Sequence, residues 1–124
     1  MNIEQAVITE LKALVTNKAY PVEAPQNTSA PYITVAMTNR EEENCLDGYS
    51  GLVKKYFDIE AYAGTYADMK TLQDAIITEA KTWQLSTIAS TGPYVQQVEI
   101  DNTNEFYQTD VNMHWCLVEI IIHY

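Results

Sequence analysis

Apolar and polar side chains alternate along one stretch of the chain, from Val53 to Ala63. The alternation has one exception, because Lys55 falls among the apolar positions. A period of two residues predicts a β-strand with one buried face and one wetter face. The wetter face carries Lys54, Tyr56, Asp58, Glu60 and Tyr62. We expect this strand to belong to a sheet that the rest of the chain completes.

Two segments show instead the three- and four-residue spacing of a helix with one apolar face. The first begins after Asn2, which forms a capping-box pattern with Gln5. Its apolar positions are Ile3, Val7, Ile8, Leu11, Leu14 and Val15. The second begins after Thr65, with Asp68 three positions on, as in a short version of the same cap. Its apolar positions are Met69, Leu72, Ile76, Ala80 and Trp83. Each helix needs an apolar surface to cover, and the predicted sheet supplies it.

Three further segments are predicted to be strands: Tyr32 to Thr38, Tyr94 to Ile100 and Val111 to Tyr124. In the first of them, Ile33, Val35 and Met37 share a face. The last is apolar on both faces toward its end, which a half-exposed strand does not need. Either other parts of the chain cover its second face, or a partner subunit does.

The segments between these elements are mostly polar. Tyr20 to Pro31 holds three prolines, which exclude a helix or a central strand and predict a connector or an exposed arm. Asn39 to Ser50 is predicted to be a long hairpin loop, and such loops are often functional. A solvated loop without a function is the alternative. Asp101 to Asp110 is predicted to be a polar turn region.

Together these elements predict an α+β fold: an antiparallel β-sheet with two α-helices packed on one face, in the order α-β-β-α-β-β. The chain has 124 residues, of which 47% are hydrophobic, and this suits one domain over residues 1–124. The N-terminus lacks the pattern of a signal peptide, and the longest apolar run is interrupted by Glu119. We therefore expect a soluble protein that is made in a cytoplasm.

The chain is strongly acidic, with 17 acidic residues against 7 basic ones and a formal net charge of -10. Ordinary nucleic-acid binding is not expected, because gripping phosphates requires clustered Lys and Arg. The charge fits solubility, or a surface past which DNA moves without sticking. The nine tyrosines have no neighbouring cations, so they fit a protein interface better than a base-stacking platform.

Residues with metal-binding chemistry do not converge in the sequence. His114 and Cys116 share one face of the last predicted strand, but His123 points to the other face, and structural zinc needs four ligands. The two cysteines, Cys45 and Cys116, are too few for a disulfide framework, and we expect free thiols. No metal site is expected.

Acid-base chemistry is not indicated either. Asp58 and Glu60 lie on one strand face, where paired carboxylates can exchange protons with a substrate. Lys54 lies on the same face, so the pattern is that of an ordinary wet sheet surface. The four glycines are not grouped as in a phosphate-binding loop.

A series of short motifs runs along nearly the whole chain. After the first helix come Tyr20-Pro21, Ala24-Pro25 and Pro31-Tyr32, and then Asp47-Gly48 and Ser50-Gly51-Leu52-Val53. Asp58-Ile59-Glu60-Ala61-Tyr62 lies in the central strand, and Thr65-Tyr66 opens the second helix. Glu105, Tyr107 and Asp110 precede a final apolar strand that ends in Tyr124. In this order and spacing, the chain resembles the tail-completion proteins of tailed bacteriophages, also called tail terminators or tail-to-head joining proteins.

The resemblance implies a non-enzymatic structural protein without catalytic residues or cofactors. Proteins of this family form a ring, typically hexameric, at the head-proximal end of the tail tube. The ring stops tube polymerisation and docks to the head connector or stopper protein, and DNA passes through it without specific binding. The implied location is the head–tail junction of a phage or prophage virion assembled in the bacterial cytoplasm. The family often has arginines where this chain has Lys54 and Lys55, and near the start of the last strand, where it has His114.

Two groups of residues are our candidates for contacts in such a ring. The candidates for the ring lumen or a docking arm are Arg40, Glu41, Glu42, Glu43 and Asp47. The candidates for the subunit interface are Tyr32, Tyr56, Tyr62, Ile120 and Ile122. An acidic lumen repels DNA phosphates and reduces sticking during passage.

Other readings stay open at the level of the sequence. One is another neck component, such as a head–tail adaptor or stopper. Another is a prophage remnant that keeps the fold without an assembly role. A reading from a different class is a small cytoplasmic ligand-binding domain or enzyme, which needs a pocket with converging polar groups.

Overall fold

The computed structural model describes the backbone of residues 1–45, 48–110 and 112–124, and the side chains of these residues outside 43–50. Its elements are α1 (Ile3–Lys12), β1 (Ala19–Pro21), β2 (Tyr32–Cys45), β3 (Gly48–Ala63), α2 (Tyr66–Thr82), β4 (Ser86–Thr87), β5 (Tyr94–Val95), β6 (Gln97–Gln108) and β7 (Met113–His123). The predicted α+β class is confirmed. The predicted order lacked three short strands, β1, β4 and β5.

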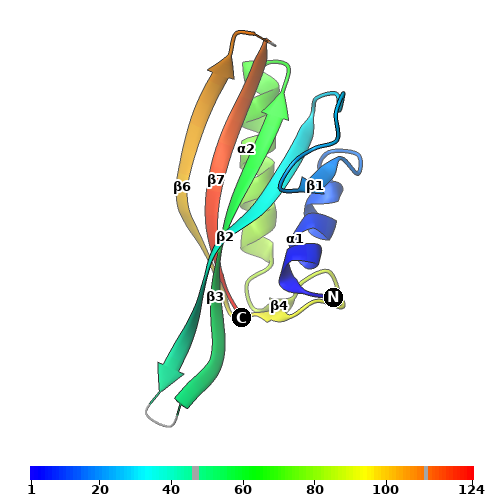
Figure 1. Ribbon diagram of the computed structural model, residues 1–124. Coiled ribbons are helices and arrows are strands. Elements are labelled where there is room, and N and C mark those ends of the chain that lie inside the picture. Colours follow the sequence, from blue (N-terminus) through cyan, green and yellow to red (C-terminus); the bar gives the residue numbers. More distant parts are fainter. Residues whose placement is uncertain (46–47, 111) are drawn as a thin grey trace.

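The described strands form one large sheet and one small one (Figure 1). The large sheet has the order β1-β2-β3-β7-β6, in which only the pair β1–β2 is parallel. β4 and β5 pair with each other in a separate two-stranded sheet. β1 ends in Pro21 and lies at the sheet edge, where a missing backbone N–H is tolerated. The predicted connector therefore contains a short edge strand.

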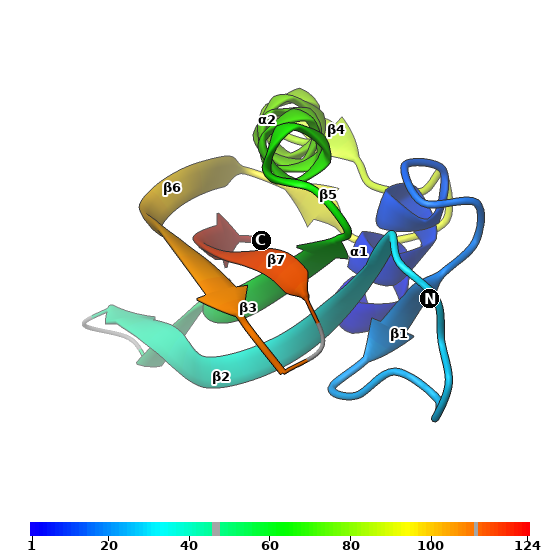
Figure 2. The same cartoon turned by 90° about the horizontal axis from the view of Figure 1, so that it is seen from above.

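Both helices lie on the same face of the large sheet, as the sequence predicts (Figure 2). α2 packs against β3 and β7, and α1 packs against β1 and β2. Apolar side chains between helices and sheet form one core, and its largest members include Ile3, Leu11, Phe57, Ile59, Met69 and Ile76. Full burial of one such side chain contributes about 1.5–3 kcal/mol. This interface between helices and sheet is therefore the main source of stability.

The predicted helix caps are both present. The Asn2 side chain accepts a hydrogen bond from the backbone N–H of Gln5 at 2.8 Å, and the Gln5 side chain accepts one from Asn2 at 3.1 Å. The Thr65 hydroxyl accepts a bond from the backbone N–H of Asp68 at 3.1 Å. The predicted apolar positions of α2 are all buried, with exposed fractions of 7% or less. Local capping and a matched apolar stripe thus set both helix starts.

Lys55, the exception in the alternation of β3, lies on the helix-covered face of the sheet. Its ammonium group forms an ion pair with Glu4 of α1 and lies 5.9 Å from the centre of the Tyr124 ring. Burial lowers the pKa of Lys55, but the bonds to Glu4 and Tyr124 raise it by more, so the net shift is upward. A half-buried cation in an apolar row therefore ties α1 to the central strand.

Two predicted polar loops are wrong. Residues 39–45, predicted to begin a loop, continue β2, and residues 48–52 belong to β3. The two strands form a hairpin that extends past the helices (Figure 1). The predicted turn after Ile100 is also strand, because β6 continues to Gln108 and pairs with β7 up to Met113. Both segments are held by backbone pairing, which needs no apolar side chains.

The two faces of β7 are buried to different degrees. Cys116, Val118, Ile120 and Ile122 face the helices and are at most 1% exposed. On the other face, Ile121 is 7% exposed while Trp115 and Leu117 are half-buried. Met37 was predicted to share a face with Ile33 and Val35, but it is 44% exposed, because β1 pairs with β2 only as far as Val35 and no described strand lies beside Met37 on that side. None of the described helices is long and apolar enough to cross a membrane.

Candidate assembly surface

The face of the large sheet turned away from both helices, here called the open face, carries the wetter side chains of the central strand. Alternation along β3 directs Tyr56, Asp58, Glu60 and Tyr62 to this face, while Phe57, Ile59 and Ala61 lie in the core. The strand register aligns these residues with side chains from β2, β7 and β6. The open face is thus one continuous surface built by four strands.

Four aromatic rings cross one end of the open face in a single row, here called the aromatic row. Tyr32, Tyr62, Trp115 and Phe106 are direct register partners on β2, β3, β7 and β6. Neighbouring ring centres lie 4.5, 5.7 and 4.2 Å apart, and the planes differ by 15 to 21°. Cross-strand aromatic pairs of this kind stabilise a sheet and hold its register. The row gives the open face a rigid apolar band.

The orientation of the rings limits what the aromatic row can bind. Because the rings stack on one another, the inner two rings have their faces covered by neighbours. Base stacking needs free ring faces beside cations that hold the phosphates. The chain has a net charge of -10, and no described Lys or Arg forms an ion pair with the row's neighbour Glu60. The row suits contact with a protein surface better than with nucleic acid.

An acidic band lies next to the aromatic row. Asp58 and Glu119 are register partners on β3 and β7, and Glu60 lies two residues from Asp58 on the same face. The hydroxyls of Tyr62 and Thr34 donate to Glu60. Burial and the charge of Glu60 raise the pKa of Asp58, and burial together with the bond to Glu60 raises the pKa of Tyr62. The band therefore favours an approaching surface that carries positive charge.

The hairpin of β2 and β3 carries the described members of the predicted lumen or docking group. Arg40 and Glu42 form an ion pair at 2.7 Å, and Glu41 lies 3.9 Å from the Lys54 ammonium. Arg40, Glu41 and Glu42 are exposed, and Lys54 is half-buried. They lie on a strand rather than a loop, as corrected above. The side chain of Glu43 and the whole of Asp47 lie outside the described residues.

The predicted interface residues divide into two sets. Tyr32, Tyr56 and Tyr62 lie on the open face and are half-buried, so part of each ring is accessible. Ile120 and Ile122 are 1% and 0% exposed in the core beneath the helices. These two isoleucines offer no surface to a partner, because the chain's own helices cover that face of β7. We therefore remove them from the candidate interface.

Sequence reasoning missed two members of the aromatic row. Trp115 was given no role in the predicted last strand, and Phe106 fell in the segment predicted to be a turn. Only the register of β6 on β7 places Phe106 beside Trp115. No alternation of apolar and polar positions marks this segment as a strand, so the sequence held no signal for it.

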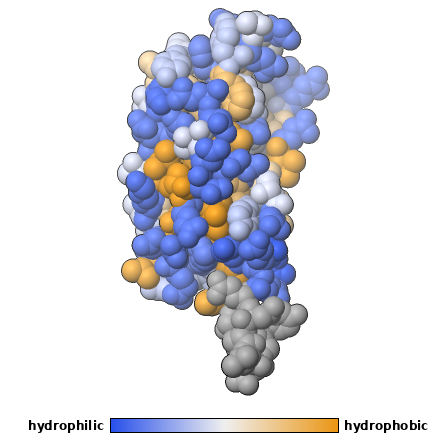
Figure 3. All heavy atoms as spheres, turned by 90° about the vertical axis from the view of Figure 1, so that its left-hand side faces the viewer, coloured by the Kyte–Doolittle hydropathy of each residue, from blue (hydrophilic) through white to orange (hydrophobic). Residues whose placement is uncertain are grey.

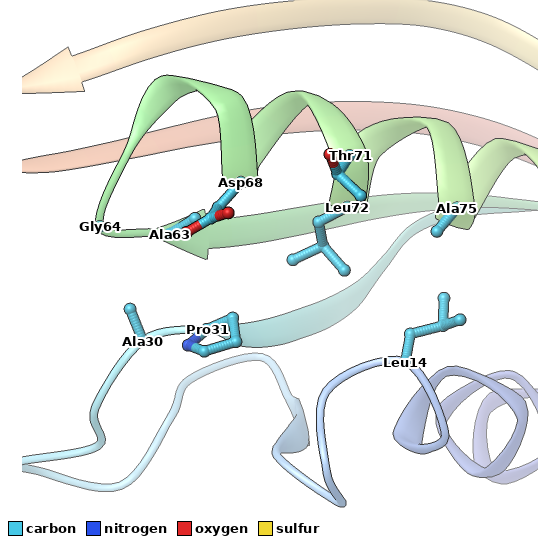
Figure 4. Close-up of a pocket in the computed structure, with 9 residues that line it drawn as sticks. All are labelled: Leu14, Ala30, Pro31, Ala63, Gly64, Asp68, Thr71, Leu72 and Ala75. Atoms are coloured by element: carbon cyan, nitrogen blue, oxygen red, sulfur yellow. The ribbon is translucent and has the colours of Figure 1, made fainter.

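Two cavities of the described structure are considered as possible ligand sites. One cavity, of about 420 Å³, lies between the end of α1, the start of α2 and Pro31 (Figure 4). Its lining is apolar except for Thr71 and Asp68. A second cavity of about 260 Å³ lies between the connector and the open face at Tyr32 and Tyr62. The single carboxylate in the cavity beside α1 and α2, that of Asp68, does not make an acid-base pair.

The histidines and the buried cysteine do not form a site. His114 packs against the rings of Tyr66 and Tyr107, with centres 6.0 and 4.5 Å away. Cys116 is 0% exposed, and burial raises the pKa of its thiol to about 11. Within the described residues, no group of three or more His, Cys, Asp or Glu side chains could hold a metal ion.

Solved structures of other proteins share the fold of this chain. A chain of the virion of a native gene transfer agent (GTA) particle is similar to it, with a TM-score of 0.67. The two chains are 12% identical, and the match covers 98% of this chain and 92% of the other. At this identity the likeness shows a shared fold. Neither a protein-family model nor a curated protein matches the chain.

Proposed function

We propose that this chain is a structural protein of a phage-like virion, and that it closes the head-proximal end of the tail tube as a hexameric ring. The observation that carries the proposal is the fold shared with a chain of a gene transfer agent virion, over 98% of one chain and 92% of the other. Because the match spans both chains, it concerns the whole domain and not a common substructure. The phage tail-completion resemblance of the sequence supports the same kind of particle.

The geometry of the chain supports assembly into a ring. A ring of identical subunits joins them head to tail, so each subunit needs two different contact surfaces. The large sheet ends in two different edges, β6 on one side and β1 with the hairpin part of β2 on the other. The open face adds an aromatic row and an acidic band that no described helix covers. Surfaces of this kind are available for contacts with further copies, with the tube protein and with the head connector or stopper.

The charge of the chain supports a passage for DNA. The net charge is -10, and the exposed hairpin carries Glu41 and Glu42 beside Arg40. Negative charge along a channel repels phosphates and reduces sticking. We place the hairpin either in the lumen of the ring or in its contact with the neck. This role requires no cofactor and no catalytic residue.

A second candidate is another component of the neck, such as a head–tail adaptor or stopper. The fold likeness supports it equally, because it concerns a chain of a virion and does not distinguish positions along the particle. The position along the particle separates the two candidates. A tail terminator binds isolated tails, whereas an adaptor or stopper binds DNA-filled heads.

The proposal is tested by measuring the mass of the protein by light scattering on a sizing column, with and without purified tail tubes. We expect a ring-sized mass, or a monomer that becomes a ring on the tube end, visible there by electron microscopy. Binding to heads and not to tails would favour the second candidate. A monomer that ignores both particles would refute a role in the neck.

The role of the hairpin has its own test. The variant with Glu41, Glu42 and Glu43 changed to Gln should impair DNA passage or assembly, measured as the yield of infectious particles. The matched control changes Glu23, Asp74 and Asp101, which are exposed elsewhere, to Gln or Asn and alters the net charge equally. Full infectivity of the hairpin variant would show that the acidic hairpin has no such role.

A further inference from the structure

The large sheet leaves two long backbone edges without a neighbouring strand in the described part of the chain. β6 forms one border of the sheet over its 12 residues. At the other border, β1 pairs only with Ile33–Val35 of β2. The continuation of β2 into the hairpin, from Ala36 onward, therefore forms the second free edge of the sheet. Exposed edges of this length are templates for pairing with another strand.

The hydrogen-bond pattern shows which groups of β6 point outward. Tyr124 and Val53 exchange both backbone hydrogen bonds, at 2.8 and 2.9 Å, so alternate residues of β7 bond to β3. The residues between them bond to β6, as the bond from Gln96 to His123 at 2.8 Å shows. Beyond the bulge at Ile100, this alternation directs the backbone groups of Thr103, Glu105 and Tyr107 away from the sheet.

The same reasoning identifies the outward groups of β2. The backbone of Ile33 bonds to Lys18 and that of Val35 to Val22, so the odd-numbered residues of this part face away from β3. The alternation continues to Met37. After the bulge that follows Met37, the register turns the backbone groups of Arg40 and Glu42 outward.

Each free edge carries the same local cap. The Asn102 side chain accepts a hydrogen bond from the backbone N–H of Thr103 at 2.9 Å. The Asn39 side chain accepts one from the backbone N–H of Arg40 at 2.8 Å. These bonds satisfy outward donors in the free chain without a partner strand. A backbone carbonyl of an added strand can replace such a side-chain oxygen.

We propose that copies of this chain join by strand pairing, with the outer edge of β6 (Asn102–Gln108) of one copy against the outer edge of β2 (Ala36–Glu42) of the next. This inference rests on the proposed function, because it takes the partner to be a second copy in a ring. It names the surface by which the copies hold together.

The sheet topology fits this pairing. Successive antiparallel pairs give β2 and β6 opposite directions in the sheet. Copies placed side by side in one orientation therefore meet through antiparallel strands, with all helices on the same side of a continuous sheet. The contact uses two different edges, so it is heterologous and leads to a ring when it closes.

The side chains along the two edges favour pairing over protection. Natural edge strands often carry Lys or Pro to prevent association, and β6 contains neither. Its Glu105 is bound to Lys70 at 2.6 Å and to Tyr66 at 3.1 Å, which offsets its charge. Phe106 and Tyr107 are 40% and 49% exposed, and Met37 on the other edge is 44% exposed. Each edge thus brings exposed apolar surface to the contact. Figure 3 shows the β6 side of the molecule, where apolar side chains lie among a hydrophilic majority.

Cysteine cross-linking tests the pairing directly. In a Cys45→Ser background, the double variant Glu42→Cys/Thr103→Cys, whose positions lie opposite each other in the proposed antiparallel pairing, is treated with a bifunctional thiol reagent under conditions in which the ring mass is observed. We expect covalent multimers up to the full ring from the double variant. Each single variant should stay monomeric, as should the control Thr78→Cys on the exposed side of α2. Dimers from Thr103→Cys alone would mean that β6 pairs with β6 about a two-fold axis, which overturns the proposal.

Proline substitution provides the second measurement. Tyr107→Pro removes an outward N–H, so it should abolish ring formation. Its monomer should have nearly the same urea midpoint as that of Tyr107→Ala, which loses the same side-chain contacts with His114 and Asn112 but keeps the N–H. Phe106→Pro removes an N–H that bonds to β7, so it should lower the midpoint. If Tyr107→Pro forms rings at the same protein concentration as the wild-type chain, the proposal is contradicted.

The outcomes separate this inference from the proposed function. A ring without β2–β6 cross-links overturns the strand pairing and leaves the function standing. Cross-linked multimers that do not bind tail ends support the pairing and overturn the function. A strict monomer with and without tubes overturns both.

Discussion

The aromatic row predicts an energetic coupling that can be measured by a double-mutant cycle. Trp115 stacks on Phe106 with ring centres 4.2 Å apart and on Tyr62 at 5.7 Å. An aromatic pair contributes about 0.5–1.5 kcal/mol beyond the burial of its area. Trp115→Ala should therefore lose about 1–3 kcal/mol from its two pairs alone. Trp115→Ala and Phe106→Ala together should cost about 1 kcal/mol less than the sum of the single changes.

The free energy of unfolding should be measured by urea denaturation at a concentration where the protein is monomeric. With a slope of about 2 kcal/mol per M, a coupling of 1 kcal/mol corresponds to about 0.5 M in the midpoint. The control cycle combines Phe106→Ala with Tyr32→Ala, at opposite ends of the row and separated by two strands. These two changes should be additive within about 0.5 kcal/mol. Equal coupling in both cycles, or none between Trp115 and Phe106, would refute the stacked geometry.

Two further predictions concern packing and charge. Gly92→Ala should lower the free energy of unfolding by about 1–3 kcal/mol, because its added methyl group would lie 2.6 Å from the Ile88 carbonyl oxygen. Gly64→Ala is the matched control with open space around it, and an equal loss in both variants by urea denaturation would contradict the packing argument. Asp58→Asn should stabilise the protein at neutral pH by about 0.5 kcal/mol or less, because burial and the charge of Glu60 raise the pKa of Asp58. A raised pKa in the folded state means that the ionised form opposes folding, so wild-type stability from Asp58 rises as the pH falls through this pKa. The difference in urea midpoint between Asp58→Asn and the wild-type protein should therefore become smaller as the pH is lowered from 7 to 4. A difference that becomes larger would contradict a raised pKa of Asp58.

The helices and the central strand follow from local sequence. Asn2 with Gln5 and Thr65 with Asp68 place the side-chain oxygens where the first free N–H groups of each helix need them. The apolar stripe of α2 and the alternation of β3 have periods of about 3.6 and 2, so each predicts its own buried face. These signals involve residues within a few positions of one another, so they can be recognised in the sequence without knowledge of the fold.

The hairpin and β6 needed the tertiary structure. Residues 39–45 and 101–108 are exposed or polar, so no alternation marks them as strands. Residues 39–45 are extended because their backbone pairs with β3, and residues 101–108 because theirs pairs with β7. Backbone hydrogen bonds are the same for every residue type except proline, and a side-chain pattern therefore does not report them.

By itself, the sequence determined the fold class, both helix caps, the core face of β3 and α2, and the acidic net charge. Only the tertiary structure decided which residues meet on the open face. Tyr32, Tyr62, Trp115 and Phe106 form one row because the register of four strands aligns them. The same structure buried Ile120 and Ile122 and left the edges of β2 and β6 free. Register and edges are relations between distant segments, and they exist only once the sheet has formed.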